Sequence, residues 1–103
     1  MIHELLTEGE ANAITGKTLA EYFNCDIREI TARIEQERRD GHPICASAAG
    51  GYFLPADPQE LETYCNRVHH RAAQLYKTRR ALLNVLQQML EQKEQEALQD
   101  SDK

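Results

Sequence analysis

Residues 17–39, KTLAEYFNCDIREITARIEQERR, decide the fold, because two apolar stripes of helical period meet in them at a short corner. The first stripe has the i, i+1, i+4 spacing: Leu19, Ala20 and Phe23. The second repeats isoleucine at intervals of three and four residues: Ile27, Ile30 and Ile34. Stripes this short must pack on each other, so we predict two packed helices with the three isoleucines in the core.

The corner between these helices has its own local signals. Asn24 tolerates the left-handed conformation that ends many helices, and Asp26 supplies an N-cap oxygen with Glu29 three residues later, a capping-box pattern. The second helix therefore begins at Ile27, and this is the pattern of a helix-turn-helix. Its outward face is polar and could enter a major groove. That face comprises Arg28, Glu29, Thr31, Ala32, Arg33, Glu35 and Gln36.

A β-hairpin is predicted directly after the second helix. Asp40-Gly41 and Pro43 end that helix, and residues 44–46 and 51–54 form short strands around the small-residue turn 47–50. Alternation along the second strand points one of its two aromatic residues inward. A hairpin in this position is a wing.

The residues before the helix pair carry weaker signals. Residues 2–6 predict a short amphipathic helix and residues 7–12 a loop. Ala13 and Ile14 favour a brief strand, and Thr15 is placed to cap the helix that follows.

Three segments of the chain carry a resemblance to a known family: ITGKTLAEYFNCD (14–26), REITARIEQERRDGHPI (28–44) and GGYFL (50–54). They are similar to winged helix-turn-helix regulators of the biotin-repressor and DeoR types, and look closest to small phage-associated members. The resemblance covers roughly residues 1–55. It implies that the helix from Asp26 reads DNA and that residues 47–51 form the wing tip. Arg28 matches a position that is usually basic in the family, whereas Thr31 and Ala32 stand where it often has arginines.

A long helix follows from residue 57 onward. Asp57 is a predicted N-cap, Pro58 suits the first helical position and Glu60 the third. A helix over residues 60–96 is on the order of 55 Å long, too long to be buried on a domain of half the chain. Its apolar residues alternate at spacings of four and three, so we predict that it forms a dimer with a heptad seam. The seam comprises Leu61, Cys65, Val68, Ala72, Leu75, Leu82, Leu86 and Met89. Arg79 is its one charged member, and it leaves parallel and antiparallel pairing equally open.

These elements predict a mainly α fold with a small β-wing: a winged helix-turn-helix domain (1–56), a C-terminal dimerisation helix (57–97) and a flexible acidic tail (98–103). Net charge is −5 over 103 residues and is unevenly spread. Residues 1–58 hold 10 acids and 5 bases, which opposes DNA binding because phosphate neutralisation supplies most non-specific affinity. Residues 59–90 hold 5 bases and 2 acids, a stretch that could contact phosphates, an acidic partner or only water.

Several functional classes are excluded on the residues. His42-x2-Cys45 and Cys65-x3-His69 imitate zinc half-sites, but Cys45 falls on a predicted strand and Cys65 in the seam, where cysteine acts as a small hydrophobe. We therefore expect no metal and no other cofactor. Gly16-Lys17-Thr18 lacks the earlier glycine of a phosphate-binding loop, and no catalytic constellation is present, so no enzyme is expected. Without an apolar span or a secretory signal, we expect a cytoplasmic protein that does not enter membranes.

The function predicted from the sequence is that of a sequence-specific, dimeric regulator of transcription that binds a palindromic site on double-stranded DNA. Its predicted DNA contacts are Lys17, Arg28, Glu29, Thr31, Ala32, Arg33, Gln36, Ser47 and Ala48. The alternative is a protein-interaction module that has kept the same fold and docks a protein partner through its acidic surface or its C-terminal helix.

Overall fold

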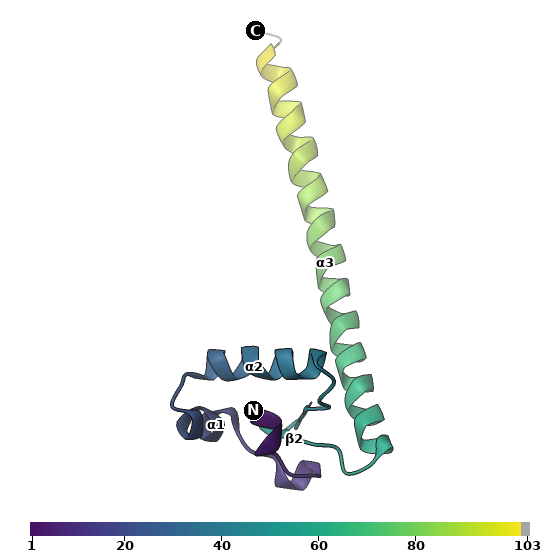
Figure 1. The fold of residues 1–103 in the computed structure, drawn as a ribbon. Coiled ribbons are helices and arrows are strands. Elements are labelled where there is room, and N and C mark those ends of the chain that lie inside the picture. Colours follow the sequence, from purple (N-terminus) through teal and green to yellow (C-terminus); the bar gives the residue numbers. More distant parts are fainter. Residues whose placement is uncertain (102–103) are drawn as a thin grey trace. The chain divides into compact units, whose positions relative to one another are not determined.

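The computed structural model describes the backbone of residues 1–101 and the side chains of residues 1–99 (Figure 1). It is mainly helical, with three α-helices, of which the C-terminal one is long, and one small antiparallel sheet. The helical elements are the 3-10 turns η1 (Ile2–Glu4) and η2 (Glu10–Asn12) and the helices α1 (Gly16–Phe23), α2 (Ile27–Arg39) and α3 (Pro58–Ser101). The strands are β1 (Cys45–Ala46) and β2 (Tyr52–Phe53). The chain divides into two compact units between Asn66 and Arg67.

The predicted boundaries of α1 and α2 are confirmed by their caps. Thr15 Oγ1 accepts from the Thr18 N–H at 3.1 Å, and Asp26 Oδ1 accepts from the Glu29 N–H at 2.8 Å. Asn24 has φ 53° and ψ 50°, the left-handed conformation predicted at the corner. Each of these residues satisfies backbone groups that a helix end leaves unpaired.

The core of the first unit lies between η1, α1, α2 and the start of β1. Its fully buried members are Ile2, Leu6, Leu19, Ala20, Ile30, Ile34 and Ile44. Phe23 is half-buried and packs against this cluster. The prediction for Ile27 is wrong, because its side chain is 55% exposed. A Cβ built on Gly16 would lie 4.0 Å from Ile27 Cγ2, so the start of α1 comes close to Ile27 without covering it.

The predicted hairpin is confirmed. β1 and β2 pair antiparallel with Cys45 opposite Phe53 and Ala46 opposite Tyr52, and the turn between the strands begins at Ser47. Phe53 is the buried aromatic residue and Tyr52 is half-buried, as alternation requires.

The brief strand predicted at residues 13 and 14 is reduced to one antiparallel bridge. Ile14 and Tyr52 exchange backbone hydrogen bonds of 2.9 and 2.8 Å. The two backbone segments approach closely at Gly51, where a Cβ would lie 3.1 Å from the Ile14 carbonyl oxygen. The φ of Gly51, 107°, also favours glycine. A second, parallel bridge pairs Glu8 with Leu54, so two isolated bridges join the segment before α1 to β2 and the residue that follows it.

The N-terminal segment is tighter than the predicted helix and loop. Residues 2–4 form one 3-10 turn that buries Ile2, and a second 3-10 turn occupies residues 10–12. A 3-10 turn closes its hydrogen bonds between residues three apart, whereas an α-helix needs residues four apart, so the 3-10 turn suits segments this short.

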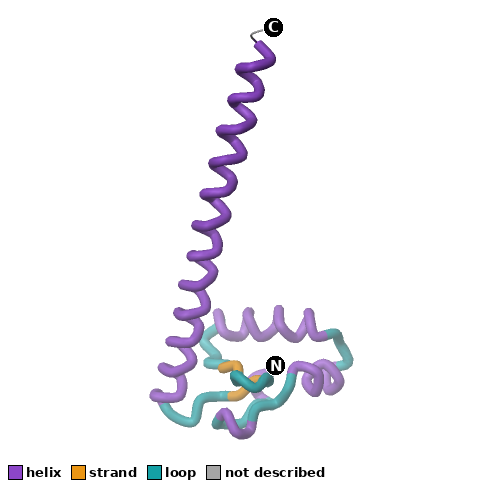
Figure 2. Tube along the Cα trace, turned by 180° about the vertical axis from the view of Figure 1, so that it is seen from behind, coloured by secondary structure: helices purple, strands orange, loops and turns teal. Residues whose placement is uncertain are grey.

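α3 begins as predicted and ends later than predicted. Asp57 Oδ1 accepts from the Glu60 N–H at 2.8 Å, and Glu60 Oε1 accepts from the Ala56 N–H at 3.0 Å. The helix continues past residue 97 to Ser101, because neither glycine nor proline interrupts residues 97–101. Positions 102 and 103 of the predicted tail lie outside the described residues. In the second unit, residues 67–101 are all helical (Figure 2).

Candidate functional site

One face of α2 is fixed by the core and the opposite face is exposed. Ile30, Ile34 and Glu37, at the i, i+4, i+7 spacing, are buried. All of the predicted base-reading residues are exposed on the remaining surface of this helix: Arg28, Glu29, Thr31, Ala32, Arg33 and Gln36. Lys17 is exposed in the first turn of α1. Arg28 and Ala32 therefore lie opposite the buried stripe, whereas Thr31 and Arg33 lie on its two flanks.

Several of these side chains already have partners within α2. Arg33 Nη2 pairs with Glu29 Oε1 at 2.7 Å, and its guanidinium lies 5.6 Å from the centre of the Phe23 ring. Gln36 Nε2 donates to Asp40 Oδ1 at 3.1 Å, and Thr31 Oγ1 donates to the Ile27 carbonyl at 3.1 Å.

Arg28 differs from its neighbours, because its side chain makes no hydrogen bond or ion pair with any residue that the structure describes. Its guanidinium has five N–H donors in a planar fork. Arg28 can therefore offer this fork to an acceptor pair without breaking an internal contact.

Arg39 is a cation of this surface that the sequence reasoning missed. It is exposed in the last turn of α2 and lies on the same stripe as Arg28 and Ala32, because positions i, i+4 and i+11 of a helix face the same direction. The i+11 spacing is the signal that would have found it.

The tip of the hairpin is bound to an acidic side chain. Glu10 Oε1 accepts from Ser47 Oγ at 3.1 Å and from the Ala48 N–H at 3.3 Å. A phosphate brought to Ser47 or Ala48 would meet the Glu10 carboxylate at short range, and like charges repel. These two predicted contacts are therefore poorly suited to binding a phosphate.

Glu37 is the buried polar residue of the core in the described chain, 6% exposed. Its carboxylate accepts from the Ile2 N–H at 3.0 Å and the His3 N–H at 2.9 Å, and it contacts His3 Nδ1 at 2.6 Å. Burial alone would raise the pKa of Glu37, but the hydrogen bonds from His3 and Ile2 outweigh it and lower that pKa below its ordinary value. Glu37 thus ties η1 to the inner face of α2.

Arg38 ties α2 to the hairpin and to the start of α3. Its Nε donates to the Ile44 carbonyl at 2.8 Å, its Nη2 donates to Tyr64 Oη at 2.8 Å, and its Nη1 pairs with Glu35 at 2.6 Å. Together with Glu37, this arginine fixes α2 from both sides of its C-terminal half. The outward surface is therefore carried by a rigidly held helix.

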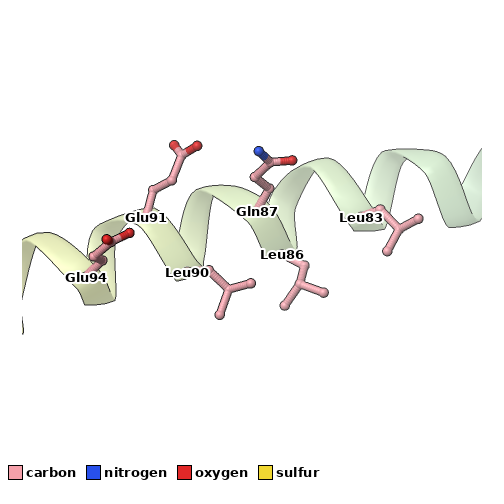
Figure 3. A pocket seen from close by; sticks show the side chains of 6 residues that line it. All are labelled: Leu83, Leu86, Gln87, Leu90, Glu91 and Glu94. Atoms are coloured by element: carbon pink, nitrogen blue, oxygen red, sulfur yellow. The ribbon is translucent and has the colours of Figure 1, made fainter.

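The predicted seam of α3 is exposed over most of its length. Leu75 and Leu82 are 66% and 64% exposed, and Val68, Leu86 and Met89 are exposed as well. Cys65 is also exposed, whereas Leu61 and Ala72 are half-buried. Figure 3 shows three leucines, Leu83, Leu86 and Leu90, pointing to one side of the helix, with Gln87 and Glu91 on another. A broad apolar strip therefore runs along the second unit without cover from the described chain.

Two of the four residues that imitate a zinc site, His42 and Cys45, make other contacts. His42 stacks on His3 with ring centres 3.6 Å apart, and Cys45 Sγ is buried and lies 3.7 Å from the Pro43 carbonyl oxygen. Among the described residues, no three histidine, cysteine or acidic side chains gather as a ligand set.

Over the described chain, no helix combines the length and the apolar character needed to cross a bilayer. Comparisons of the chain with protein-family models, with curated proteins and with solved structures find no match.

Proposed function

We propose that this protein is a sequence-specific regulator of transcription that binds double-stranded DNA as a dimer. In this proposal α1 and α2 are a helix-turn-helix, the β1–β2 hairpin is the wing of a winged-helix domain, and α3 joins two copies. The observation that carries the proposal is the exposed outward surface of α2, with Arg28 unpaired among the described residues and the opposite side of the helix fixed in the core.

The dimensions of α2 suit a major groove. Its 13 residues make a rod about 20 Å long, and a helix with side chains is about 10–12 Å across, close to the groove width of about 12 Å. The unpaired fork of Arg28 matches the O6 and N7 acceptors of guanine. Thr31 and Ala32 beside it can contact a thymine methyl group.

Charge sets the conditions for binding. Besides Arg28, the exposed cations near this surface that form no ion pair with a described residue are Lys17 and Arg39. The carboxylate of Glu10 is hydrogen-bonded to the hairpin tip. We therefore leave Ser47 and Ala48 out of the proposed interface. Non-specific affinity should be low at physiological salt. Linking two reading heads in a dimer compensates, because the second head then binds at high effective concentration.

A second candidate is a protein-interaction module. The observation that favours it is the combination of an acidic first unit with the exposed leucines of α3. Large exposed apolar patches mark protein interfaces more often than nucleic-acid interfaces. In that case α2 would have no DNA to read, and its arginines would not affect partner binding.

Selection from a pool of random duplexes tests the proposal, with two variants beside the wild type. Arg28→Ala should recover the same motif with one base position relaxed, because one bidentate contact gives roughly 1–3 kcal/mol of discrimination. Lys17→Ala should recover the unchanged motif with lower affinity and a salt slope reduced by about one. If no sequence is enriched, and a protein partner captured from lysate binds wild type and Arg28→Ala equally, the second candidate replaces the first.

A further inference from the structure

We infer that two copies of α3 pair antiparallel, centred on residues 82–90, so that the basic segment 71–80 of each helix lies beside the acidic segment 91–96 of the other. This inference rests on the dimer of the proposed function and adds the partner face and its direction. It is carried by the charges along the exposed seam of α3.

The seam has charged members whose neighbours depend on direction. Its alternating spacing of four and three continues past Met89 to Lys93 and Glu96, with Arg79 further back in the same seam. In a parallel pair each of these residues meets its own copy, which places like charges together at all three positions. A charge held in an interface without an opposite partner is strongly unfavourable. Parallel pairing therefore places like charges together at Arg79, Lys93 and Glu96.

Antiparallel pairing removes all three like-charge contacts. In an antiparallel coiled coil, a residue at the first apolar position of the heptad faces a residue at the second apolar position of the other helix. Two registers are centred on the apolar strip: in the first Leu82 faces Leu86, and in the second Leu86 faces Met89. In the first register Arg79 faces Met89 and Lys93 faces Leu75, so that long aliphatic stems cover apolar neighbours. Glu96 then faces the small side chain of Ala72. In the second register Arg79 faces Glu96, an opposite charge.

The flanking charges favour the same direction. Between residues 63 and 90 the chain has no acidic residue, whereas residues 91–96 hold three acids and one base. Four exposed cations of the first segment form no ion pair with a described residue: Arg71, Lys77, Arg79 and Arg80. The acids Glu91, Glu94 and Glu96 are exposed as well. An antiparallel pair brings the two segments together, over their whole length in the register with Leu82 opposite Leu86 and at residues 79–80 in the register with Leu86 opposite Met89. A parallel pair places each segment beside its own copy.

The apolar centre fits a two-fold axis. The strip in Figure 3 continues into Leu82, Val85 and Met89, so the broadest apolar surface of α3 lies midway between the basic and acidic segments. A two-fold interface is self-complementary, because the same patch is used by both copies. In both registers more than half of residues 82–90 in one copy lie against the same segment of the other copy.

The direction sets distances that can be measured. With 1.5 Å of rise per residue, the two copies of position 74 lie about 30–40 Å apart in the antiparallel registers, against roughly 10 Å in a parallel pair. The two copies of position 67 lie about 50–60 Å apart along the pair.

Spin labels at one position measure the direction in the full chain without DNA. Gln74→Cys is labelled in a background with Cys25→Ser and Cys65→Ser, while the buried Cys45 is retained. We expect an inter-label distance of about 30–40 Å, broadened by the label arms, in the antiparallel pair. A distance within about 20 Å, or a monomer by sedimentation, overturns the inference.

A charge exchange supplies the matched control. Arg79→Glu with Arg80→Glu should raise the dimer dissociation constant roughly 3- to 10-fold, because it gives both segments the same charge and makes the two symmetric Arg79–Glu96 contacts of the second register repulsive. Adding Glu94→Arg and Glu96→Arg should restore association. In a parallel pair neither change alters the sign pattern, so equal association of the three proteins contradicts the inference. A parallel pair that still enriches a DNA motif overturns this inference alone, and an antiparallel pair without a motif overturns only the proposed function.

Discussion

Glu37 holds the N-terminal turn on α2 by accepting hydrogen bonds from Ile2 and His3. Its pKa is lowered in the folded state, because these hydrogen bonds outweigh the effect of burial. An unfolded glutamate has a pKa of about 4.3. The folded carboxylate therefore contributes stability that is fully present above the unfolded pKa and is lost as the pH falls through the folded pKa.

Replacing this carboxylate tests the linkage. Glu37→Gln should lower the free energy of unfolding by about 1–3 kcal/mol at pH 7, because hydrogen bonds to a charged acceptor are replaced by weaker ones. The deficit should begin to shrink as pH falls below the unfolded pKa of about 4.3, because the unfolded wild-type chain then binds a proton that the folded carboxylate does not. Urea unfolding at pH 7 and pH 3.5 measures both values. A deficit that is the same at both pH values would mean that the charge of Glu37 has no part in stability.

At the scale of elements, α2 depends on the cap at its first turn. Asp26→Ala removes the acceptor of the Glu29 N–H and should lower the free energy of unfolding by about 1 kcal/mol. Glu21→Ala, an exposed substitution within α1, should stay within about 0.5 kcal/mol of the wild type. Thermal or urea unfolding of both variants gives the comparison, and equal stability of the two would remove the cap from the account.

The apolar seam of α3 gives the second prediction at this scale. Leu75→Asp with Leu86→Asp places carboxylates in the proposed interface and should yield a monomer in sedimentation, because a buried unpaired charge costs more than exposed pairs contribute. Gln74→Asp with Gln88→Asp adds the same charge at positions outside the seam, and this variant should remain a dimer. A mass that does not change in the leucine variant would show that α3 does not pair through this seam.

The elements also show which signals the sequence contains. Thr15, Asn24 and Asp26 act on backbone groups within three residues, so their roles could be predicted without the rest of the chain. The exposure of Ile27 could not, because it depends on which parts of the folded chain lie over the first turn of α2. Glu10 at the hairpin tip depends on a contact across 37 residues, which periodicity does not encode. Glu37 had a signal, since it continues the Ile30 and Ile34 stripe, but its charge argued against burial.

For the whole molecule, folding should not depend on a metal. A structural zinc site contributes folding free energy outright, so removing its ion would melt the domain. His42 and Cys45 are instead held by a histidine stack and by burial in the first unit. Circular dichroism should be the same with and without a strong chelator, including the unfolding temperature. A loss of helical signal on chelation would show that a metal is bound.

The central claim is that the exposed face of α2 reads DNA sequence, and equilibrium titration of two duplexes tests it most directly. One duplex carries the selected motif and the other has the same bases in shuffled order. At physiological salt we expect the dimer to bind the selected duplex at least about 10³-fold more tightly, because this acidic protein has little non-specific affinity. Arg28→Ala should narrow that ratio by about 10- to 100-fold. Equal affinity for the two duplexes, or a ratio unchanged in Arg28→Ala, would contradict the claim.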